Sequence, residues 1–277
     1  LALRAVPGVE VVADGAYARA MRLPHGDATV VLRPRPDHVA ATLRLADVRD
    51  LAPAVARCRR LLDLDADPVA VDAVLGSDPA LAASVAAEPG VRVPRAVDGF
   101  EIALRAIVGQ QVSLVGGLTL LGRIAAAADR MTGGSAPAVD GDGDGDGHDP
   151  AAALRPFPHA AVVAELPDRA FAMPAARAAT IRTLAAGVAS GELLLDGGAD
   201  RDATVEALRG IPGIGEWTAG YVAMRALGDP DVFLETDLAV RRAAARTGLP
   251  DTRRGLSDYA RTWAPWRSYA VIRLWRK

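Results

Sequence analysis

A short turn with two glycines constrains the fold of this chain more than any other feature. The turn reads Ile211-Pro-Gly-Ile-Gly215, and residues 202–209 and 216–226 on either side have helical patterns. Glycine adopts backbone angles that other residues avoid, so two glycines allow a tight turn. Apolar Leu208, Ile211 and Ile214 recur in register with a helical hairpin. We therefore predict a helix-hairpin-helix over residues 202–226, with an ordinary helix–helix turn as the alternative.

The same turn predicts a site for an anion. The first N–H groups of a helix have no partner within the helix, and the helix dipole favours negative charge there. A DNA phosphate fits such a site, so the candidate DNA-binding residues are Gly213, Ile214, Gly215 and Thr218. Backbone amides do not register in net charge, so a chain of formal net charge −2 can still bind DNA. We predict no cofactor and no metal centre, although residues 210–215 are a candidate site for a monovalent cation.

The rest of the chain divides into a short β region and a long helical region. Strands are expected in four β-branched runs between turn signals, at Val9–Val12, Tyr17–Leu23, Thr29–Leu32 and Val39–Arg44. Apolar spacing predicts helices at Leu51–Leu62, Pro68–Leu75, Pro79–Ala87, Gly99–Val108, Ser113–Ala128, Arg177–Ser190, Asp202–Arg209, Glu216–Ala226, Asp237–Thr247 and Leu256–Trp275. The fold class is therefore mainly α, with a small N-terminal antiparallel sheet. We place an N-terminal α/β domain at residues 1–90 and a helical domain at 91–277. A truncated start of the N-terminal domain is a further expectation.

One segment interrupts the helical region. Residues 132–150 include the run Asp140–Gly147, in which Asp and Gly alternate and nothing apolar can be buried. The first half of this run is similar to a calcium-binding EF-hand loop, but Ala151 stands at the twelfth position, where the ligand set needs Glu. We predict a low-complexity surface loop, and a calcium site is the alternative.

Cysteine content and hydropathy exclude several classes of protein. Cys58 is the only cysteine among the 277 residues, so neither a cysteine-ligated zinc site nor an iron–sulfur cluster can form. No charge-free apolar run is long enough for a transmembrane helix, and no signal peptide opens the chain. We expect a cytoplasmic protein that is associated with the nucleoid if it binds DNA.

Asp237 is the candidate for chemistry. It follows the apolar run Val232–Leu234 and lies where a helix is expected to begin. Aspartate is a favoured N-cap residue, so a purely structural role is the first interpretation. A cap also fixes the rotamer of the carboxylate, so capping and catalysis are compatible.

Four segments occur in a characteristic order, Phe100–Ser113, Ile211–Ala219, Asp231–Asp237 and Trp263–Ala270. Together they resemble the helix-hairpin-helix DNA glycosylase superfamily, and within it the DNA-3-methyladenine glycosylase II family, the AlkA type. The resemblance covers residues 99–277 well and the N-terminal part loosely. It implies a two-lobed helical glycosylase fold that follows a TATA-binding-protein-like α/β domain without a catalytic residue.

The resemblance implies that Asp237 is catalytic. A carboxylate near the sugar stabilises the positive charge that develops as the glycosidic bond breaks, and it can orient a water molecule. Family members with a lyase step carry a lysine two residues after the second glycine of the hairpin, and that position is Trp217 here. Lys277 is the only lysine of the chain. We therefore expect a monofunctional enzyme that leaves an abasic site.

Trp217, Tyr221 and Trp275 resemble the base-binding pocket of the family. Trp217 and Tyr221 are four residues apart and therefore lie on one face of a helix. A base alkylated at a ring nitrogen is cationic, and a cation over an aromatic face gains about 0.5–2 kcal/mol. We predict that this pocket takes bases of the 3-methyladenine or 7-methylguanine type. Packing in the core is the alternative role for the three aromatic residues.

Extrusion of a base from duplex DNA costs about a few kcal/mol and leaves a space to be filled. The resemblance places the filling side chain at Gln111, where the best-known member has an apolar residue. A plain turn between two helices is the alternative role of this segment.

Double-stranded DNA with damaged bases is the expected partner, with no membrane, and we expect a monomer. In some relatives the domain follows a methyl-transfer regulator in one polypeptide, so an upstream fusion of this kind is a further expectation. Two other functions stay open. One is a non-catalytic helix-hairpin-helix DNA-binding module, and the other is a glycosylase with a different lesion specificity.

Overall fold

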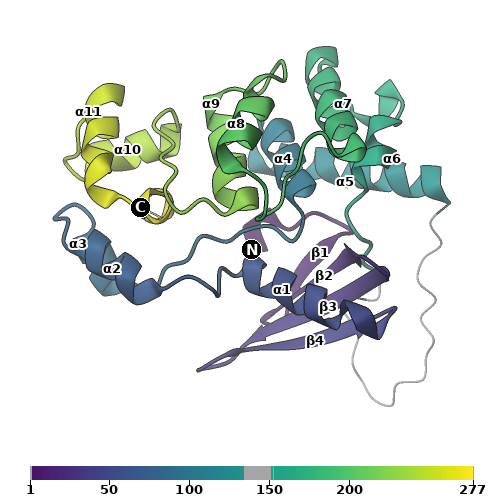
Figure 1. The fold of residues 1–277 in the computed structure, drawn as a ribbon, viewed down its shortest axis with the longest axis horizontal. Coiled ribbons are helices and arrows are strands. Elements are labelled where there is room, and N and C mark those ends of the chain that lie inside the picture. The colour runs from purple at the N-terminus through teal and green to yellow at the C-terminus, as the bar shows by residue number, and fades with distance from the viewer. Residues whose placement is uncertain (1, 134–150, 152, 277) are drawn as a thin grey trace. The chain divides into compact units, whose positions relative to one another are not determined.

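The computed structural model describes residues 2–133, 151 and 153–276, and Figure 1 shows the order of their helices and strands. Contacts group the chain into two units. The first, which we call the sheet unit, comprises Leu1–Arg57 and Ile107–Glu192. The second, which we call the hairpin unit, comprises Cys58–Ala106 and Leu193–Lys277. The sequence-based domain division at residue 90 follows chain order and stays a prediction.

The sheet unit contains one antiparallel sheet with the strand order β1-β2-β3-β4. The strands are β1 (Glu10–Ala13), β2 (Ala16–Leu23), β3 (Gly26–Pro34) and β4 (Val39–Leu45), as the sequence predicts. Each strand follows its neighbour through a hairpin, so spatial order and chain order agree. The register pairs Ala18 with Val31 and Val31 with Thr42.

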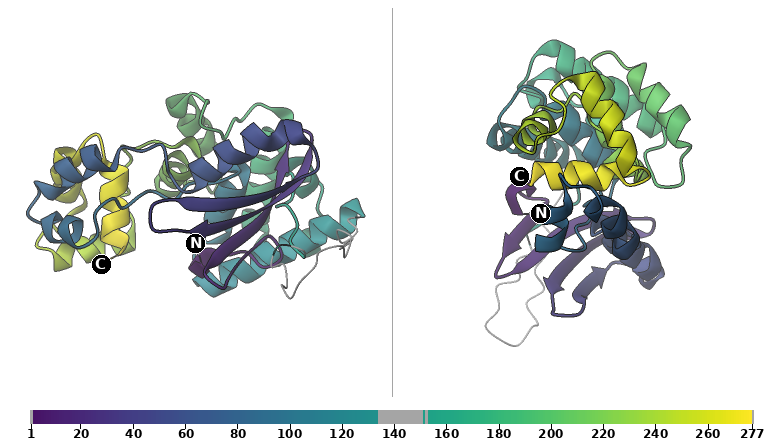
Figure 2. Two further views of the ribbon diagram at one scale, coloured as in Figure 1. Left: turned by 90° about the horizontal axis from the view of Figure 1, so that it is seen from below. Right: turned by 90° about the vertical axis from the view of Figure 1, so that its left-hand side faces the viewer.

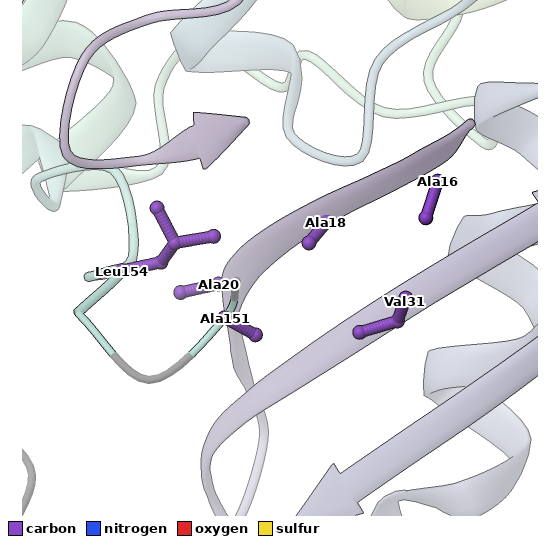
Figure 3. Packing of buried hydrophobic residues seen from close by; sticks show 6 residues of the cluster. All are labelled: Ala16, Ala18, Ala20, Val31, Ala151 and Leu154. Atoms are coloured by element: carbon purple, nitrogen blue, oxygen red, sulfur yellow. The ribbon is translucent and has the colours of Figure 1, made fainter. Parts of the chain in front are cut away.

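Small side chains on one face of β2 form part of the core of the sheet unit. Ala16, Ala18 and Ala20 alternate along the strand, and they share a buried cluster with Val31, Ala151 and Leu154 (Figure 3). Because side chains on a strand alternate between two faces, three alanines at this spacing allow another segment to approach the sheet closely. Ala151, the twelfth position of the candidate calcium loop, is therefore a core residue. The run Asp140–Gly147 lies outside the described residues.

The helices of the sheet unit follow the predicted pattern, with additions. They are α1 (Leu51–Leu61), whose last turn lies in the hairpin unit, the end of α4 (Gly99–Val108), α5 (Leu114–Thr132), α6 (Ala160–Ala164) and α7 (Ala175–Ser190), with 3₁₀ turns η1 (Ala2–Arg4), η2 (Val48–Asp50) and η3 (Asp168–Ala170). Arg57 of α1 donates to the carbonyl of Arg22 on β2 (2.6 Å), and α1 lies along the sheet in Figures 1 and 2. The short α6 and the 3₁₀ turns have no clear periodicity in the sequence, so they were not predicted.

The hairpin unit is helical in its described residues. Its early part contains α2 (Pro68–Gly76), α3 (Ala82–Ala87) and most of α4. Its later part contains α8 (Arg201–Arg209), α9 (Glu216–Val222), the π-helical turn η4 (Ala223–Leu227), α10 (Leu238–Arg246), α11 (Arg253–Tyr259), the 3₁₀ turn η5 (Ala260–Trp263) and α12 (Arg267–Trp275). The helix predicted over Glu216–Ala226 is thus α-helical only as far as Val222 and then widens into η4.

The single helix predicted over Leu256–Trp275 is wrong. The structure has α11, η5 and then a separate helix, α12. Proline lacks the N–H that a helix interior needs, and it disfavours a helical conformation in the residue before it. Ala264 is accordingly extended (φ −61°, ψ 142°) immediately before Pro265. Because of this break α12 starts anew and carries Trp275 at its end.

Candidate active site

The glycine turn joins α8 to α9 as a helical hairpin. Asp200 caps α8 by accepting from the N–H of Ala203, and the helix ends at Gly210. The side chains of Leu208 and Ile214 are buried, and their packing fixes the turn against the rest of the hairpin unit. The helix-hairpin-helix interpretation of these residues therefore agrees with the local geometry.

The two glycines of the turn have different conformations. Gly213 has φ +93°, a region that favours glycine, as the sequence predicts. Gly215 has φ −94° and ψ −178°, which is extended backbone open to any residue. A Cβ on Gly215 would meet no atom within 4 Å. The expectation that both glycines supply unusual backbone angles is therefore wrong for Gly215.

The candidate DNA-binding residues of the turn divide by exposure. Gly213 and Gly215 are exposed, whereas Ile214 and Thr218 are buried. The Ile214 N–H donates to the carbonyl of Ile211 (3.0 Å), so this amide holds the turn together. The first backbone hydrogen bond of α9 runs from Ala219 to Gly215 (3.0 Å), so the amide of Gly215 lies ahead of the helical ladder. Of the four candidate residues, only Gly213 and Gly215 are therefore open to a molecule that approaches this turn.

Asp237 is the N-cap of α10. Its Oδ1 accepts from the N–H of Val240 (2.9 Å), and its own N–H donates to the carbonyl of Leu234 (3.0 Å). The capping role predicted from the sequence is confirmed. The buried side chain of Leu234 anchors the chain just before the cap, so the carboxylate position is fixed from both sides.

Two indole rings converge on the same carboxylate. Trp217 Nε1 donates to Asp237 Oδ2 (2.8 Å), and Trp275 Nε1 donates to Asp237 Oδ1 (3.1 Å). The first indole comes from α9 and the second from the end of α12. Asp237 therefore joins three elements of the hairpin unit through three N–H donors, each of them neutral.

Tyr221 completes an aromatic group with the two tryptophans. The rings of Trp217 and Tyr221 are stacked, with centroids 5.1 Å apart and an interplanar angle of 18°. The Trp275 ring is tilted by 45° to that of Tyr221, with centroids 6.2 Å apart. Tyr221 is buried, whereas both tryptophans are half-buried. The structure thus brings the predicted pocket residues and Asp237 together.

Arg225 is a member of this aromatic group that sequence reasoning did not assign. Its guanidinium carbon lies 5.4 Å from the centre of the Tyr221 ring, and Nη1 donates to the tyrosine hydroxyl (3.3 Å). Arg225 lies one turn after Tyr221, on the π-helical turn η4. The four-residue spacing is the signal in the sequence that could have suggested this contact.

The segment before Asp237 is held by side chains from two helices, α12 and α11, and α12 supplies Arg267 and Ser268. Arg267 binds Asp231 with Nε and Nη2, each at 2.7 Å. The hydrogen bonds that Arg267 donates to the Asp231 carboxylate raise the pKa of its guanidinium. Ser268 accepts from the N–H of Val232 (3.0 Å) and donates to the carbonyl of Asp229 (2.8 Å).

Arg253 connects the hairpin to this segment. Its Nη2 lies 2.6 Å from Glu216, at the start of α9, and 2.6 Å from Glu235, two residues before Asp237. Burial acts to raise the pKa of the Glu235 carboxyl, but hydrogen bonds from Ser257 and Arg253 outweigh it and lower that pKa overall. A cavity of about 220 Å³ lies beside this cluster, lined by α8, α9 and residues 233–236.

Buried polar contacts anchor the region that carries Trp275. Three carboxylates early in the chain each hold a residue 185 to 206 positions later. The pairs are Trp263 Nε1 with Asp78 Oδ2 (2.7 Å), Tyr269 Oη with Asp63 Oδ2 (2.8 Å) and Arg273 Nη2 with Asp72 Oδ1 (2.7 Å). Burial, with a further contribution from Asp63, raises the pKa of the Tyr269 hydroxyl. Separations of this length leave no periodic signal, so sequence reasoning missed these pairs.

Gln111, the predicted wedge, belongs to the sheet unit. It lies between α4 and α5, is exposed, and has φ +56°, which is uncommon for a residue other than glycine. Ser113 then caps α5 by accepting from the N–H of Gly116 (3.1 Å).

The described residues form neither a metal site nor a membrane-spanning helix. Over residues 2–133, 151 and 153–276, no group of His, Cys, Asp and Glu side chains has the arrangement of a metal site. In that same part of the chain, no helix is both long and apolar enough to cross a bilayer. Lys277, the only lysine, lies outside the described residues.

Comparisons with known proteins add to this geometry. The AlkA N-terminal domain family matches residues 1–98. The chain is 48% identical, over 99% of its length, to a Mycobacterium tuberculosis protein named probable bifunctional transcriptional activator/DNA repair enzyme AlkA, of which it covers 53%. It is 34% identical, over 99% of its length, to DNA-3-methyladenine glycosylase 2 of Escherichia coli, of which it covers 90%. A 3-methyladenine DNA-glycosylase from Archaeoglobus fulgidus has a similar structure, with a TM-score of 0.80 at 21% identity over 99% of this chain and 91% of that one.

These similarities differ in extent. The chain spans about half the length of the mycobacterial relative and nine tenths of the one from Escherichia coli. The structural similarity confirms the predicted fold class, a mainly α helix-hairpin-helix glycosylase fold with a small N-terminal antiparallel sheet.

Proposed function

The chain belongs to the DNA-3-methyladenine glycosylase 2 family, the AlkA type, and on this premise we propose that it excises alkylated bases from double-stranded DNA. The reaction is hydrolysis of the N-glycosidic bond, and the product is an abasic site. The substrates are bases of the 3-methyladenine and 7-methylguanine type, whose positive charge makes them good leaving groups.

The environment of Asp237 is the observation that carries this proposal. Its carboxylate is held by two indole N–H groups and one backbone N–H, and within the described residues it forms no ion pair. No cationic side chain therefore neutralises the carboxylate within the described residues, and its negative charge can stabilise the positive charge that develops on the sugar. An ionised carboxylate has about four acceptor positions, so about one remains for a water molecule.

The aromatic group supports a cationic substrate. Trp217 and Trp275 are half-buried, so part of each side chain is accessible. The ring of Tyr221 stacks on that of Trp217 and holds it in place. A cationic base over such a ring gains about 0.5–2 kcal/mol. The indole N–H groups are already occupied by Asp237, so the rings are expected to bind a base through their faces.

The exposed turn at Gly213 and Gly215 supports binding of the DNA backbone. Helix N-termini and their amides attract phosphate without adding to net charge. We further propose that the chain acts on DNA as a monomer in the cytoplasm.

The direct test is release of methylated purines from methylated duplex DNA, measured by chromatography. Wild-type protein should release 3-methyladenine or 7-methylguanine. Asp237→Asn should lower the rate by at least about tenfold, because it removes the charge that stabilises the sugar cation. Asparagine still caps a helix, so the fold should persist.

Asp67→Asn is the matched control. Asp67 caps α2 in the same unit by accepting from Val69 and Ala70, and it has no part in the proposed chemistry. This variant should keep the wild-type rate. Wild-type rates in a folded Asp237→Asn variant would rule out the proposed role of this carboxylate.

A further inference from the structure

The exposed face of α10 carries three arginines. Arg241, Arg242 and Arg246 are exposed, whereas Val240, Ala243 and Ala244 form the buried face. Among the residues that the structure describes, no acidic side chain forms an ion pair with any of the three arginines. We call these three residues the α10 arginine face.

Local physical chemistry disfavours this arrangement. Arg242 and Arg246 are four residues apart on the helix, where like charges repel. Arg241 and Arg242, the fourth and fifth of the nine residues of α10, gain nothing from the helix dipole, which favours cations only in the last turn. Only Arg246, in the last turn, has a favourable position relative to the dipole. Charges that lower the stability of their own helix point to a function outside it.

Four other arginines in the same unit are neutralised by the chain itself. Each of them lies within 2.7 Å of a carboxylate oxygen: Arg253 at Glu216 and Glu235, Arg267 at Asp231, Arg273 at Asp72 and Arg276 at Glu88. Ion pairs within the hairpin unit thus neutralise these four arginines. The α10 arginine face keeps its positive charge for another molecule.

The position of α10 suggests which molecule this is. The helix begins at Asp237, and the N–H of Arg241 donates to the Asp237 carbonyl (3.0 Å), one turn into the helix. With a rise of about 1.5 Å per residue, the three arginines lie about 6–14 Å from the cap along the helix axis. The three arginines span about 7.5 Å along α10, and phosphates of one DNA strand recur about every 3.4 Å along the duplex axis, so the face is long enough to contact more than one phosphate.

We propose that Arg241, Arg242 and Arg246 bind phosphates of the DNA strand next to the nucleotide whose base is excised. This inference rests on the proposed function, because it takes the nucleotide at Asp237 as its reference point. Guanidinium groups bind phosphate through two parallel hydrogen bonds. The face supplies a local basic contact in a chain whose formal net charge is −2.

The test is the salt dependence of binding to a duplex that contains a tetrahydrofuran abasic-site analogue. Fluorescence anisotropy gives the slope of log K against log salt concentration between about 50 and 200 mM. Each single variant, Arg241→Gln, Arg242→Gln or Arg246→Gln, should weaken binding severalfold and reduce the slope by about 0.9. The triple variant should reduce it by two to three. The corresponding lysine variants keep the charge, so they should restore the slope.

Two controls separate this role from others. Arg60→Gln removes the same charge from a half-buried arginine on α1 and should leave the slope unchanged. The triple variant should have an unchanged or higher melting temperature, because it relieves repulsion on α10. A clearly lower melting temperature would mean a structural role and would overturn the proposal.

The outcomes also distinguish this inference from the proposed function. If wild-type protein releases methylated bases and the triple variant keeps the wild-type slope, the arginine face does not bind DNA. If wild-type protein neither binds the duplex nor releases a base, the proposed function fails, and this inference fails with it. Tight binding to vesicles of anionic lipid, with no binding to the duplex, would also overturn it.

Discussion

The backbone conformation requires glycine at position 213 but not at position 215. The positive φ of Gly213 is a conformational requirement. The extended backbone of Gly215 is not, and the empty space at its Cβ position shows that the protein itself does not need a glycine there. A requirement for Gly215 would therefore come from a molecule that approaches the turn.

This difference gives a prediction for two alanine variants. Gly213→Ala should lower the free energy of unfolding by about 1–2 kcal/mol, because a side chain is disfavoured at positive φ. Gly215→Ala should change it by less than about 0.5 kcal/mol, yet weaken binding to the abasic-site duplex, because its methyl group would stand where a phosphate approaches. Urea unfolding and anisotropy measure the two effects separately. Equal binding by Gly215→Ala and wild type would contradict phosphate contact at this turn.

At the scale of elements, α12 shows how a site residue depends on buried polar contacts. Arg273 has no exposed surface, and it binds Asp72 as well as the carbonyls of Ser84 (3.0 Å) and Glu88 (3.2 Å). Arg276, one turn later, binds the carboxylate of Glu88 at the surface. Arg273 on α12 and the C-cap residue Arg276 thus offer a buried and an exposed arginine for comparison, each in an ion pair.

We expect the two pairs to differ strongly in their effect on stability. Arg273→Met should lower the free energy of unfolding by about 3–5 kcal/mol, because it removes the fully buried charged partner of the half-buried Asp72 carboxylate. Arg276→Met should change it by less than about 1 kcal/mol, since exposed ion pairs contribute little. Denaturant titration of both variants measures the difference. Similar losses in the two would show that burial does not set the strength of these contacts.

At the scale of the whole molecule, the inventory of nucleophiles limits the chemistry. Lys277 is the only lysine, and Trp217 occupies the position where lyases of the superfamily have one. Because Trp217 replaces the lysine at that position, no Schiff base between that position and the sugar is expected to form. The reaction should therefore stop at the abasic site.

Strand cleavage gives the check on this prediction. Reacted duplex should remain intact in a denaturing gel and should break only after hot alkali. Treatment with borohydride should trap no covalent protein–DNA adduct. A trapped adduct in the wild-type reaction would mean that another amine of the chain attacks the sugar.

The sequence alone determined much of the local structure, and some of the site. Periodicity and turn residues predicted the strands and most helices, since these depend on neighbours a few residues apart. The hairpin, the cap at Asp237 and the spacing of Trp217 and Tyr221 are local in the same sense. The resemblance drawn from four motifs is confirmed at the level of the family by the similarity to the relative from Escherichia coli.

Only the tertiary structure decided which distant groups meet. Trp275 reaches Asp237 from 38 residues away, and Asp72 neutralises Arg273 from 201 residues away. Such contacts depend on how helices pack, and a single sequence does not encode packing as a repeat. The backbone angles at Gly215 were likewise set by the three-dimensional path of the chain. The helix break before Pro265, in contrast, is a local effect of proline that the sequence carries. Within the part of the chain that the structure describes, the α10 arginine face has no ion pair. The tertiary structure decided this too, because it determines which acidic side chains lie near the three arginines.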